Sequence, residues 1–244
     1  MSEIPLRITP DMLLSRRVDF ERRMRRLPRI TTWLIALLVF VFTTELAADA
    51  LNTPDGLVVM GALVRSAVAA GEYWRLFSAT LLHASFDHLL GNSIALFVLG
   101  MVCEHAFGHR QFVLLYVTSA LGGSALSLLV SPGPSVGASG AIFGLQGAAV
   151  ALFRRHRDRL LMRDRRIGVV LVVWAVYSVL NGLMTPYVDN GAHIGGFASG
   201  WVVGRQLHPV VLGPMSPEHA RRVRRWLWVV WVVLGYTAVG WLAR

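Results

Sequence analysis

At residues 134–144 stands the stretch PSVGASGAIFG, in which a serine lies between glycines, after a Pro/Gly loop and before an apolar run. Because Gly-Pro-Ser extends a helix poorly, we expect a helix to begin near Ala138 or Ser139. Ser139 would then lie at a helix N-terminus, where unpaired N–H groups and the positive end of the helix dipole favour an anion. These are the requirements of an activated nucleophile beside an oxyanion site. Small-residue packing between membrane helices is the commoner use of such a stretch, so the rest of the chain has to distinguish the two.

The composition is that of a membrane protein. Of the 244 residues, 55% are hydrophobic and 16% are charged, and the mean hydropathy is +0.54. A soluble domain is usually nearer to a quarter charged. Several apolar runs approach the ~20 residues that cross a bilayer. We therefore expect an all-α polytopic membrane protein.

Arginine accounts for all of the positive charge. The formal net charge is +10, and all 24 basic residues are arginines. They gather at 16–29, 154–166 and 221–225, each cluster beside an apolar run. The preference for positive charge on the cytoplasmic side explains this better than nucleic-acid binding, so we expect no nucleic-acid partner. The single cysteine, Cys103, lies inside an apolar run and excludes an intramolecular disulfide.

The apolar runs predict seven spans, at about 31–50, 85–106, 111–130, 139–153, 167–185, 192–207 and 226–243. Residues 1–30 form a basic segment, either a short amphipathic helix or a solvated tail, and residues 51–84 a long loop with an interfacial helix. The chain therefore divides into 1–30, a six-span core at 31–208, and a basic linker with a seventh helix at 209–244. The arginine clusters predict that the N-terminus lies in the cytoplasm and the C-terminus outside. The membrane is expected to be a bacterial-type cell membrane.

Ser139 and His193 are expected at the same depth of the membrane. Each opens a span, and each lies 15 residues before a basic residue at the inner end, Arg154 or His208. Such a helix covers ~22 Å of a ~30 Å core, which places both residues roughly 8 Å below the outer boundary.

Glycine stripes predict that the fourth and sixth spans touch. The stripes are Gly140, Gly144 and Gly147 in one span and Gly196, Gly200 and Gly204 in the other. Glycines at this spacing let two helix backbones approach closely. We therefore expect these spans to pack face to face, with Ser139 near His193.

His88 and Asn92 lie four residues apart on one face of the second span, in its outer half. Taken alone, Asn92 indicates an interhelical hydrogen bond and His88 a capping or interface histidine. Polar groups at membrane depth are costly unless they face a cavity or a partner. Beside a serine and a histidine at matching depth, both side chains can supply donors to an oxyanion.

At this point the chain resembles the rhomboid intramembrane serine proteases. The residues that carry the resemblance are Gly137-Ala138-Ser139-Gly140, Ala192-His193-Ile194-Gly195-Gly196, His83-x4-His88-x3-Asn92, Trp74-Arg75 and Glu104. The resemblance covers about residues 31–208. It implies a six-helix core with a Ser–His dyad and no acidic third member, and the seventh span is similar to the subclass with one extra C-terminal helix.

The resemblance also implies roles for single residues. Ser139 would be the nucleophile and His193 the general base. The oxyanion site would comprise His88, Asn92 and Gly137, with the backbone N–H of Ser139. Supporting residues would be Phe143, His83, Trp74, Arg75 and Glu104. Some family members have tyrosine at this position. Phe143 can keep the stacking on the imidazole that a tyrosine ring makes, but it lacks the tyrosine hydroxyl.

No cofactor or metal is expected, because H-E-x-x-H is absent and His83 and His88 diverge by about 140° on a helix. The expected partners are the lipid bilayer and transmembrane protein substrates, cleaved near the outer face of the membrane. Asp189 could orient His193 as a third member, but a solvated loop aspartate is the favoured interpretation. The alternatives are a catalytically inactive rhomboid-like chaperone or adaptor and, less favoured, a small transporter.

Overall fold

The computed structural model describes residues 26–53, 55–159, 162–185 and 188–243. The expectations for residues 1–25 lie outside the described residues. The larger helices are α3 (Arg29–Ala47), α7 (Phe86–Phe107), α8 (His109–Val130), α9 (Ser139–Arg155), α10 (Met162–Met184), α11 (Asn190–Gln206) and α12 (Pro217–Leu242). Each of the seven expected spans therefore contains a helix.

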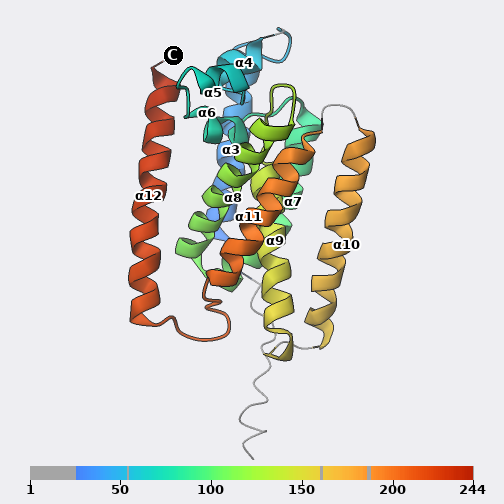
Figure 1. Ribbon diagram of the computed structural model, residues 1–244, viewed down its shortest axis with the longest axis vertical. Coiled ribbons are helices and arrows are strands. Elements are labelled where there is room, and N and C mark those ends of the chain that lie inside the picture. Colours follow the sequence, from blue (N-terminus) through green and yellow to red (C-terminus); the bar gives the residue numbers. More distant parts are fainter. Residues whose placement is uncertain (1–25, 54, 160–161, 186–187, 244) are drawn as a thin grey trace, which may run out of the picture.

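The segment between α3 and α7 is a series of short helices, as the mixed composition of residues 51–84 predicts. They are α4 (Gly56–Met60), α5 (Arg65–Ala69), α6 (Arg75–Ser78) and the 3-10 turn η1 (Ala79–Leu81). These short helices cover one end of the bundle, which is also the end at which the chain terminates (Figure 1). In the described part of the chain the only β pairing is an isolated antiparallel bridge between Leu63 and Ser135.

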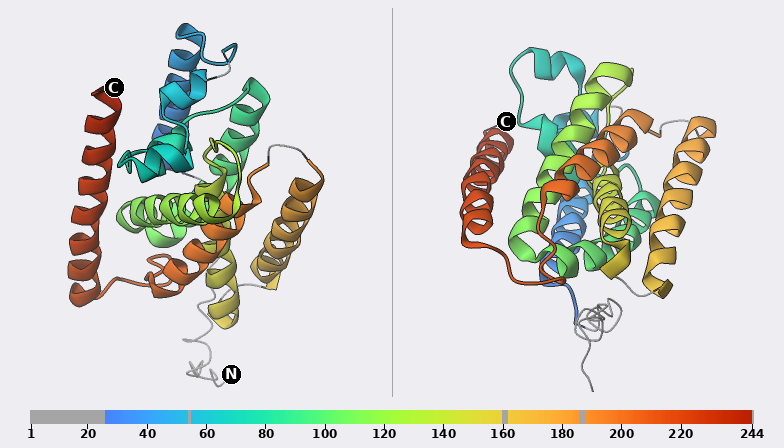
Figure 2. Two further views of the ribbon diagram at one scale, coloured as in Figure 1. Left: turned by 45° about the horizontal axis from the view of Figure 1, so that its top comes forward. Right: turned by 60° about the horizontal axis from the view of Figure 1, so that its bottom comes forward.

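Helix α9 is the centre of the bundle. Its side chains from Gly140 to Phe153 are all buried, and α7, α8, α10 and α11 all pack against it. Helices α10 and α12 stand on opposite flanks of this group (Figures 1 and 2). Five of the described helices are long and apolar enough to cross a membrane, whereas α9 and α11 have 17 residues each. The expected fold class, an all-α polytopic membrane protein, is confirmed.

The glycine stripes of α9 and α11 lie against each other, as expected. A Cβ atom on Gly196 would overlap the carbonyl of Gly140, and one on Gly200 would overlap the carbonyl of Gly144. Further along, a Cβ on Gly204 would come within 2.7 Å of Ala148. The two backbones thus touch along most of their length, which only glycine and other small residues permit.

The seventh helix starts earlier than expected. It begins at Pro217 rather than near residue 226, because Ser216 caps it by accepting a hydrogen bond from the backbone N–H of His219, and Pro217 fits the first helical turn. The second half of the expected basic linker is therefore helical. Helix α12 packs against α8 and α6.

Two buried glutamates connect helices at opposite ends of the bundle. Glu104 accepts hydrogen bonds from the backbone N–H groups of Ile30 and Thr31, so it caps the start of α3 from α7. Glu45, near the end of α3, is fully buried, and its Oε1 accepts a hydrogen bond from the backbone N–H of His83. The bond from the backbone offsets part of the cost of burying the Glu45 carboxyl group, whose other oxygen, Oε2, has no partner among the described residues.

Candidate active site

Ser139 is the first residue of α9, and the loop before it has a shape that only glycine favours. Gly137 has φ of +121°, and its N–H donates to the carbonyl of Ala79 at 2.9 Å. Helix α9 has no side-chain cap, since Ala138 occupies that position. The first N–H groups of the helix therefore have no intrahelical partner. They point along the helix axis toward its N-terminal end, where Ser139 lies.

His193 lies in the first turn of α11 and reaches Ser139. Its Nε2 is 2.9 Å from Ser139 Oγ, a hydrogen bond between residues 54 positions apart. The ring of Phe143 stacks on the imidazole at 4.2 Å between centroids, with 10° between the planes. Because Phe143 lies one turn after Ser139, α9 supplies both the hydroxyl and the aromatic face that hold the imidazole.

Among the described residues, no third group is hydrogen-bonded to the imidazole. The Nδ1 of His193 is buried and has no hydrogen-bond partner among the described residues. Asp189 was expected to be a solvated loop residue, which was wrong: it is half-buried, and its carboxylate accepts from the hydroxyls of Ser127 and Ser131 and from the N–H of Ala192. The Asp189 carboxylate is therefore hydrogen-bonded to groups other than the imidazole.

His88, Asn92 and Gly137 converge beside Ser139. A Cβ on Gly137 would lie 2.8 Å from His88 Nε2 and 3.5 Å from Asn92 Nδ2, so both side chains point at the backbone just before the serine. Asn92 is 8% exposed, and its Nδ2 has no partner among the described residues. Gly137 contributes space here rather than a donor, since its own N–H is bonded to Ala79.

His83 supports this group by packing against His88. It is fully buried, its ring meets that of His88 edge to face at 5.1 Å between centroids, and its backbone is bonded to Glu45. The ring therefore fixes one side of His88 by packing. Neither nitrogen of the His83 ring has a partner within the described structure.

Trp74 and Arg75 organise the segment of short helices between α3 and α7, called the outer segment here because the arginine distribution predicts that it lies outside the cell, instead of contacting the serine. Arg75 donates to the carbonyls of Val58 and Ala62 at 2.6 and 2.9 Å and to Glu72 at 2.6 Å. Its guanidinium lies 4.7 Å from the centre of the Trp74 ring. These contacts tie α6 to α4 and to the residues that follow α4.

An apolar crevice opens beside the imidazole, between α9, α10 and α11. It has a volume of about 400 Å³ and includes Phe143, His193 and Phe197, with Val172 and Val176 on the α10 side. Helix α10 packs loosely, with only 17% of its most apolar window buried. Among the described residues, no cluster of three or more His, Cys, Asp or Glu side chains could hold a metal ion.

Comparison with known proteins gives a consistent family match. The model of the Rhomboid domain family matches residues 70–210. Rhomboid protease GluP of Bacillus subtilis is 36% identical over 181 residues, which are 74% of this chain and 35% of that protein. RHOMBOID-like protein 5 of Arabidopsis thaliana is 40% identical over 148 residues, which are 59% of this chain and 47% of that protein.

A more distant relative covers both chains more evenly. Rhomboid protease AarA of Providencia stuartii is 27% identical over 199 residues, which are 71% of this chain and 70% of that protein. The chain spans between about a third and a half of the length of the other two relatives. The family model includes the segments that carry Ser139, His193, His88 and Asn92.

Proposed function

Because this chain belongs to the rhomboid family, we propose that it is an intramembrane serine endopeptidase that cleaves transmembrane proteins through Ser139 and His193. The observation that carries the proposal is the 2.9 Å hydrogen bond between Ser139 Oγ and His193 Nε2 at the start of two helices that touch backbone to backbone. A serine hydroxyl is a weak nucleophile unless a base accepts its proton, and this geometry supplies the base.

The proposed reaction needs only these two groups for its proton transfers. Ser139 Oγ attacks the scissile carbonyl carbon while His193 Nε2 takes its proton, and the imidazolium then returns that proton to the leaving amine. The result is an ester between Ser139 and the N-terminal part of the substrate. A water molecule next gives one proton to His193 while its oxygen attacks the ester carbonyl carbon. The imidazolium then returns this proton to Ser139 Oγ, which releases the acid and restores both the serine and the neutral imidazole.

Phe143 takes over the positioning role that an acidic third residue has elsewhere. In a triad, a carboxylate bonded to Nδ1 fixes the orientation of the imidazole. Here Nδ1 has no such partner within the described residues, while the Phe143 ring lies parallel to the imidazole at 4.2 Å. Stacking restricts the tilt of the ring and keeps Nε2 directed at Ser139.

We assign the oxyanion site to His88, Asn92 and the backbone N–H of Ser139. The negative charge that develops on the carbonyl oxygen needs donors that are already oriented. The unpartnered Nδ2 of Asn92 meets this requirement, because it gives up no existing hydrogen bond when the oxyanion forms. The role of Gly137 is to leave room between these two side chains and the serine.

The apolar crevice at His193 is the proposed entry for substrate. A transmembrane helix has all its carbonyls hydrogen-bonded, so it must unwind locally before a serine attacks one of them. Small or helix-breaking residues near the cut lower the cost of unwinding. With the N-terminus in the cytoplasm, as the arginine distribution indicates, the cut lies near the outer face of the membrane.

Purified protein with a single-span substrate in detergent or liposomes tests the proposal. Ser139→Ala and His193→Ala should each abolish cleavage at unchanged melting temperature, and wild type should be labelled at Ser139 by a fluorophosphonate. Cleavage by purified Ser139→Ala would refute the assignment of the nucleophile. Wild-type protein that neither cleaves nor is labelled would indicate the inactive chaperone or adaptor instead.

A further inference from the structure

Asp189 lies four residues before His193 and gathers donors from distant parts of the chain. Its Oδ2 accepts from Ser127 Oγ at 2.5 Å, and its Oδ1 accepts from Ser131 Oγ at 2.5 Å and from the backbone N–H of Ala192 at 2.9 Å. The last of these bonds caps α11. The other two connect α11 to residues about 60 positions earlier.

The serines belong to the segment that leads to the nucleophile. Ser127 lies in the last turn of α8, Ser131 directly follows that helix, and Ser135, which helps to lower the pKa of Asp189, lies four residues before Ser139. The same carboxylate therefore contacts the end of α8 and the loop that enters α9, while its own backbone enters α11.

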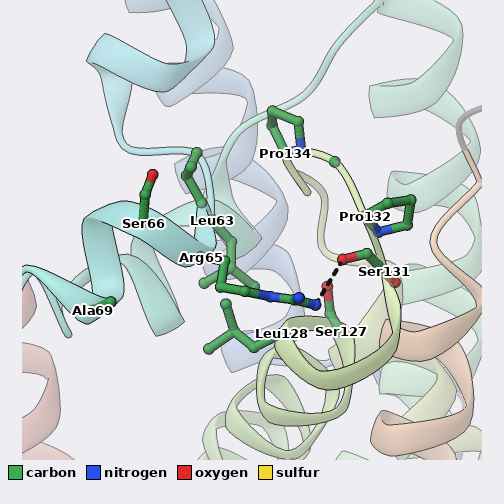
Figure 3. A pocket seen from close by; sticks show the side chains of 11 residues that line it. Leu63, Arg65, Ser66, Ala69, Ser127, Leu128, Ser131, Pro132 and Pro134 are labelled. Carbon is green, nitrogen blue, oxygen red and sulfur yellow. Dashed lines mark hydrogen bonds between the residues drawn. The ribbon is translucent and has the colours of Figure 1, made fainter.

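The opposite side of this loop is held by the outer segment. Ser135 and Leu63 exchange two backbone hydrogen bonds of 3.0 Å. Arg65 reaches across from α5 to the carbonyl of Ser131 at 3.3 Å, and Figure 3 shows this bond with Ser127 just beneath it. The loop before the nucleophile is thus fixed between the outer segment and Asp189.

The contact around the carboxylate leaves no spare room. A Cβ on Gly191 would lie 2.6 Å from Val130 Cγ2, 2.9 Å from Ser131 Oγ and 3.1 Å from Asp189 Oδ1. The start of α11 therefore presses directly on the end of α8. Because this contact is tightly packed, moving the end of either helix would break the hydrogen bonds to Asp189.

The ionisation state of the Asp189 carboxyl group matches the hydrogen-bond donors around it. Burial alone would raise the pKa of Asp189, but the hydrogen bonds from Ser127, Ser131, Ser135 and the backbone hold it below its ordinary value. The side chain is therefore ionised at neutral pH. An ionised carboxylate is an acceptor only, so all four donors find an oxygen lone pair.

We propose that Asp189 is a positioning residue for the dyad: its carboxylate, bonded to Ser127 and Ser131, holds the start of α11 against the end of α8 and the loop before α9, and so sets the distance between His193 and Ser139. The effect on catalysis rests on the proposed function, whereas the connection itself does not. A shift of about 1 Å between reacting groups costs up to about 100-fold in rate, so a small loosening has a measurable effect.

Two sets of variants separate positioning from helix capping. Asp189→Asn keeps a side chain that caps a helix as well as aspartate does, but replaces one accepting oxygen by an NH₂ group. The double variant Ser127→Ala with Ser131→Ala removes two donors and leaves the cap untouched. In both we expect kcat to fall roughly 10- to 100-fold with KM within about twofold.

Coupling between the two sets is measured by combining them. If the serines act through Asp189, the triple variant should lose no more than the more damaging of its parts. Ser199→Ala is the matched control, since Ser199 Oγ also bonds α11 to α8, by 3.1 Å to the carbonyl of Thr118, but far from the dyad. It should leave kcat and KM unchanged.

A measurement without substrate tests the connection separately. Hydrogen–deuterium exchange of amides in 132–138 and 190–196 should quicken in Asp189→Asn and in the double serine variant, but not in Ser199→Ala. Wild-type kcat and exchange in the first two variants would overturn the inference. Quickened exchange in a protein that never cleaves or labels would refute the proposed function and leave the structural connection standing. Additive losses of kcat with a raised KM would reduce Asp189 to a purely structural role.

Discussion

Asn92 and its neighbour Ser93 both carry buried polar atoms without a partner in the described structure, yet only Asn92 points at the candidate oxyanion site. Removing a buried group that has no hydrogen bond costs little stability. Removing an oxyanion donor costs about 2.7–4 kcal/mol of transition-state stabilisation, or 10²- to 10³-fold in kcat. We therefore expect Asn92→Ala to lose kcat at nearly constant KM and melting temperature.

Ser93→Ala is the control for this prediction and should leave both turnover and melting temperature unchanged. Steady-state kinetics on a single-span substrate, with thermal unfolding in detergent, measures the two quantities. A loss of activity in Asn92→Ala that merely follows a loss of folded protein would make Asn92 a packing residue.

Asp189 also gives a pH prediction. Its folded-state pKa lies below the ordinary 3.8, so its contribution to the free energy of unfolding is complete above that value and is lost as the pH falls through the lower folded-state pKa. When the melting temperature is measured at decreasing pH below pH 4, that of wild type should therefore fall further than that of Asp189→Asn, because asparagine has no carboxylate to protonate. Parallel curves for the two proteins would contradict the ionised carboxylate.

At the scale of the helices, the contact between α9 and α11 decides where Ser139 and His193 lie. Gly200→Val places a branched side chain where a single Cβ already overlaps the carbonyl of Gly144. Overpacking of this kind typically costs 1–3 kcal/mol and would push the helices apart. We expect loss of both cleavage and fluorophosphonate labelling, although neither reacting residue is changed.

Val202→Leu is the control on the same helix, since Val202 is 48% exposed on the outside of the bundle. It should have nearly wild-type rates. Wild-type activity in Gly200→Val would mean that the glycine contact does not set the distance between the two residues.

Helix α12 offers a matched pair of glycines. A Cβ on Gly240 would lie 2.5 Å from the Trp74 ring, whereas one on Gly235 would meet nothing within 4 Å. Alanine is favoured over glycine inside a helix by about 1 kcal/mol. Gly235→Ala should therefore raise the melting temperature slightly.

Gly240→Ala should instead lower the melting temperature and the activity, because Trp74 and Arg75 anchor the outer segment beside the loop before Ser139. Thermal unfolding and cleavage assays on the two variants test whether the seventh helix supports the outer segment. Equal behaviour of the two would exclude that role.

For the whole molecule, the distribution of arginine predicts one orientation. In a Cys103→Ser background, Gly133→Cys should react with a membrane-impermeant maleimide added to intact cells, and Asp158→Cys should react only after lysis. Both positions are exposed, and the native Cys103 is fully buried. Labelling of position 158 in intact cells, together with protection of position 133, would show that the orientation is opposite to the predicted one.

Much of this architecture follows from the order of residues along the chain. Apolar runs and the Pro/Gly breaks between them predict each large helix to within a few residues, except the start of α12, where a Ser-Pro cap begins the helix inside a basic segment. The glycine stripes at helical spacing also predict which helices touch, since glycines at this spacing let two helix backbones approach closely. Ser139, His193, His88 and Asn92 are identifiable as candidates because their positions along single helices set their depth and face, whereas Phe143 was expected only from the family resemblance.

The hydrogen-bond partners of polar groups at the helix ends were decided only by the tertiary structure. Glu45 bonds to His83, 38 residues away, and Asp189 bonds to Ser127, 62 residues away. Ser127 and Ser131 carry one sequence signal, a four-residue spacing at the end of a span, but that spacing names no partner. Local propensity and hydropathy determine which segments are helical and which faces are apolar. Which carboxylate meets which donor depends on the register in which the helices pack, and that register exists only once the backbones of α8, α9 and α11 are in contact.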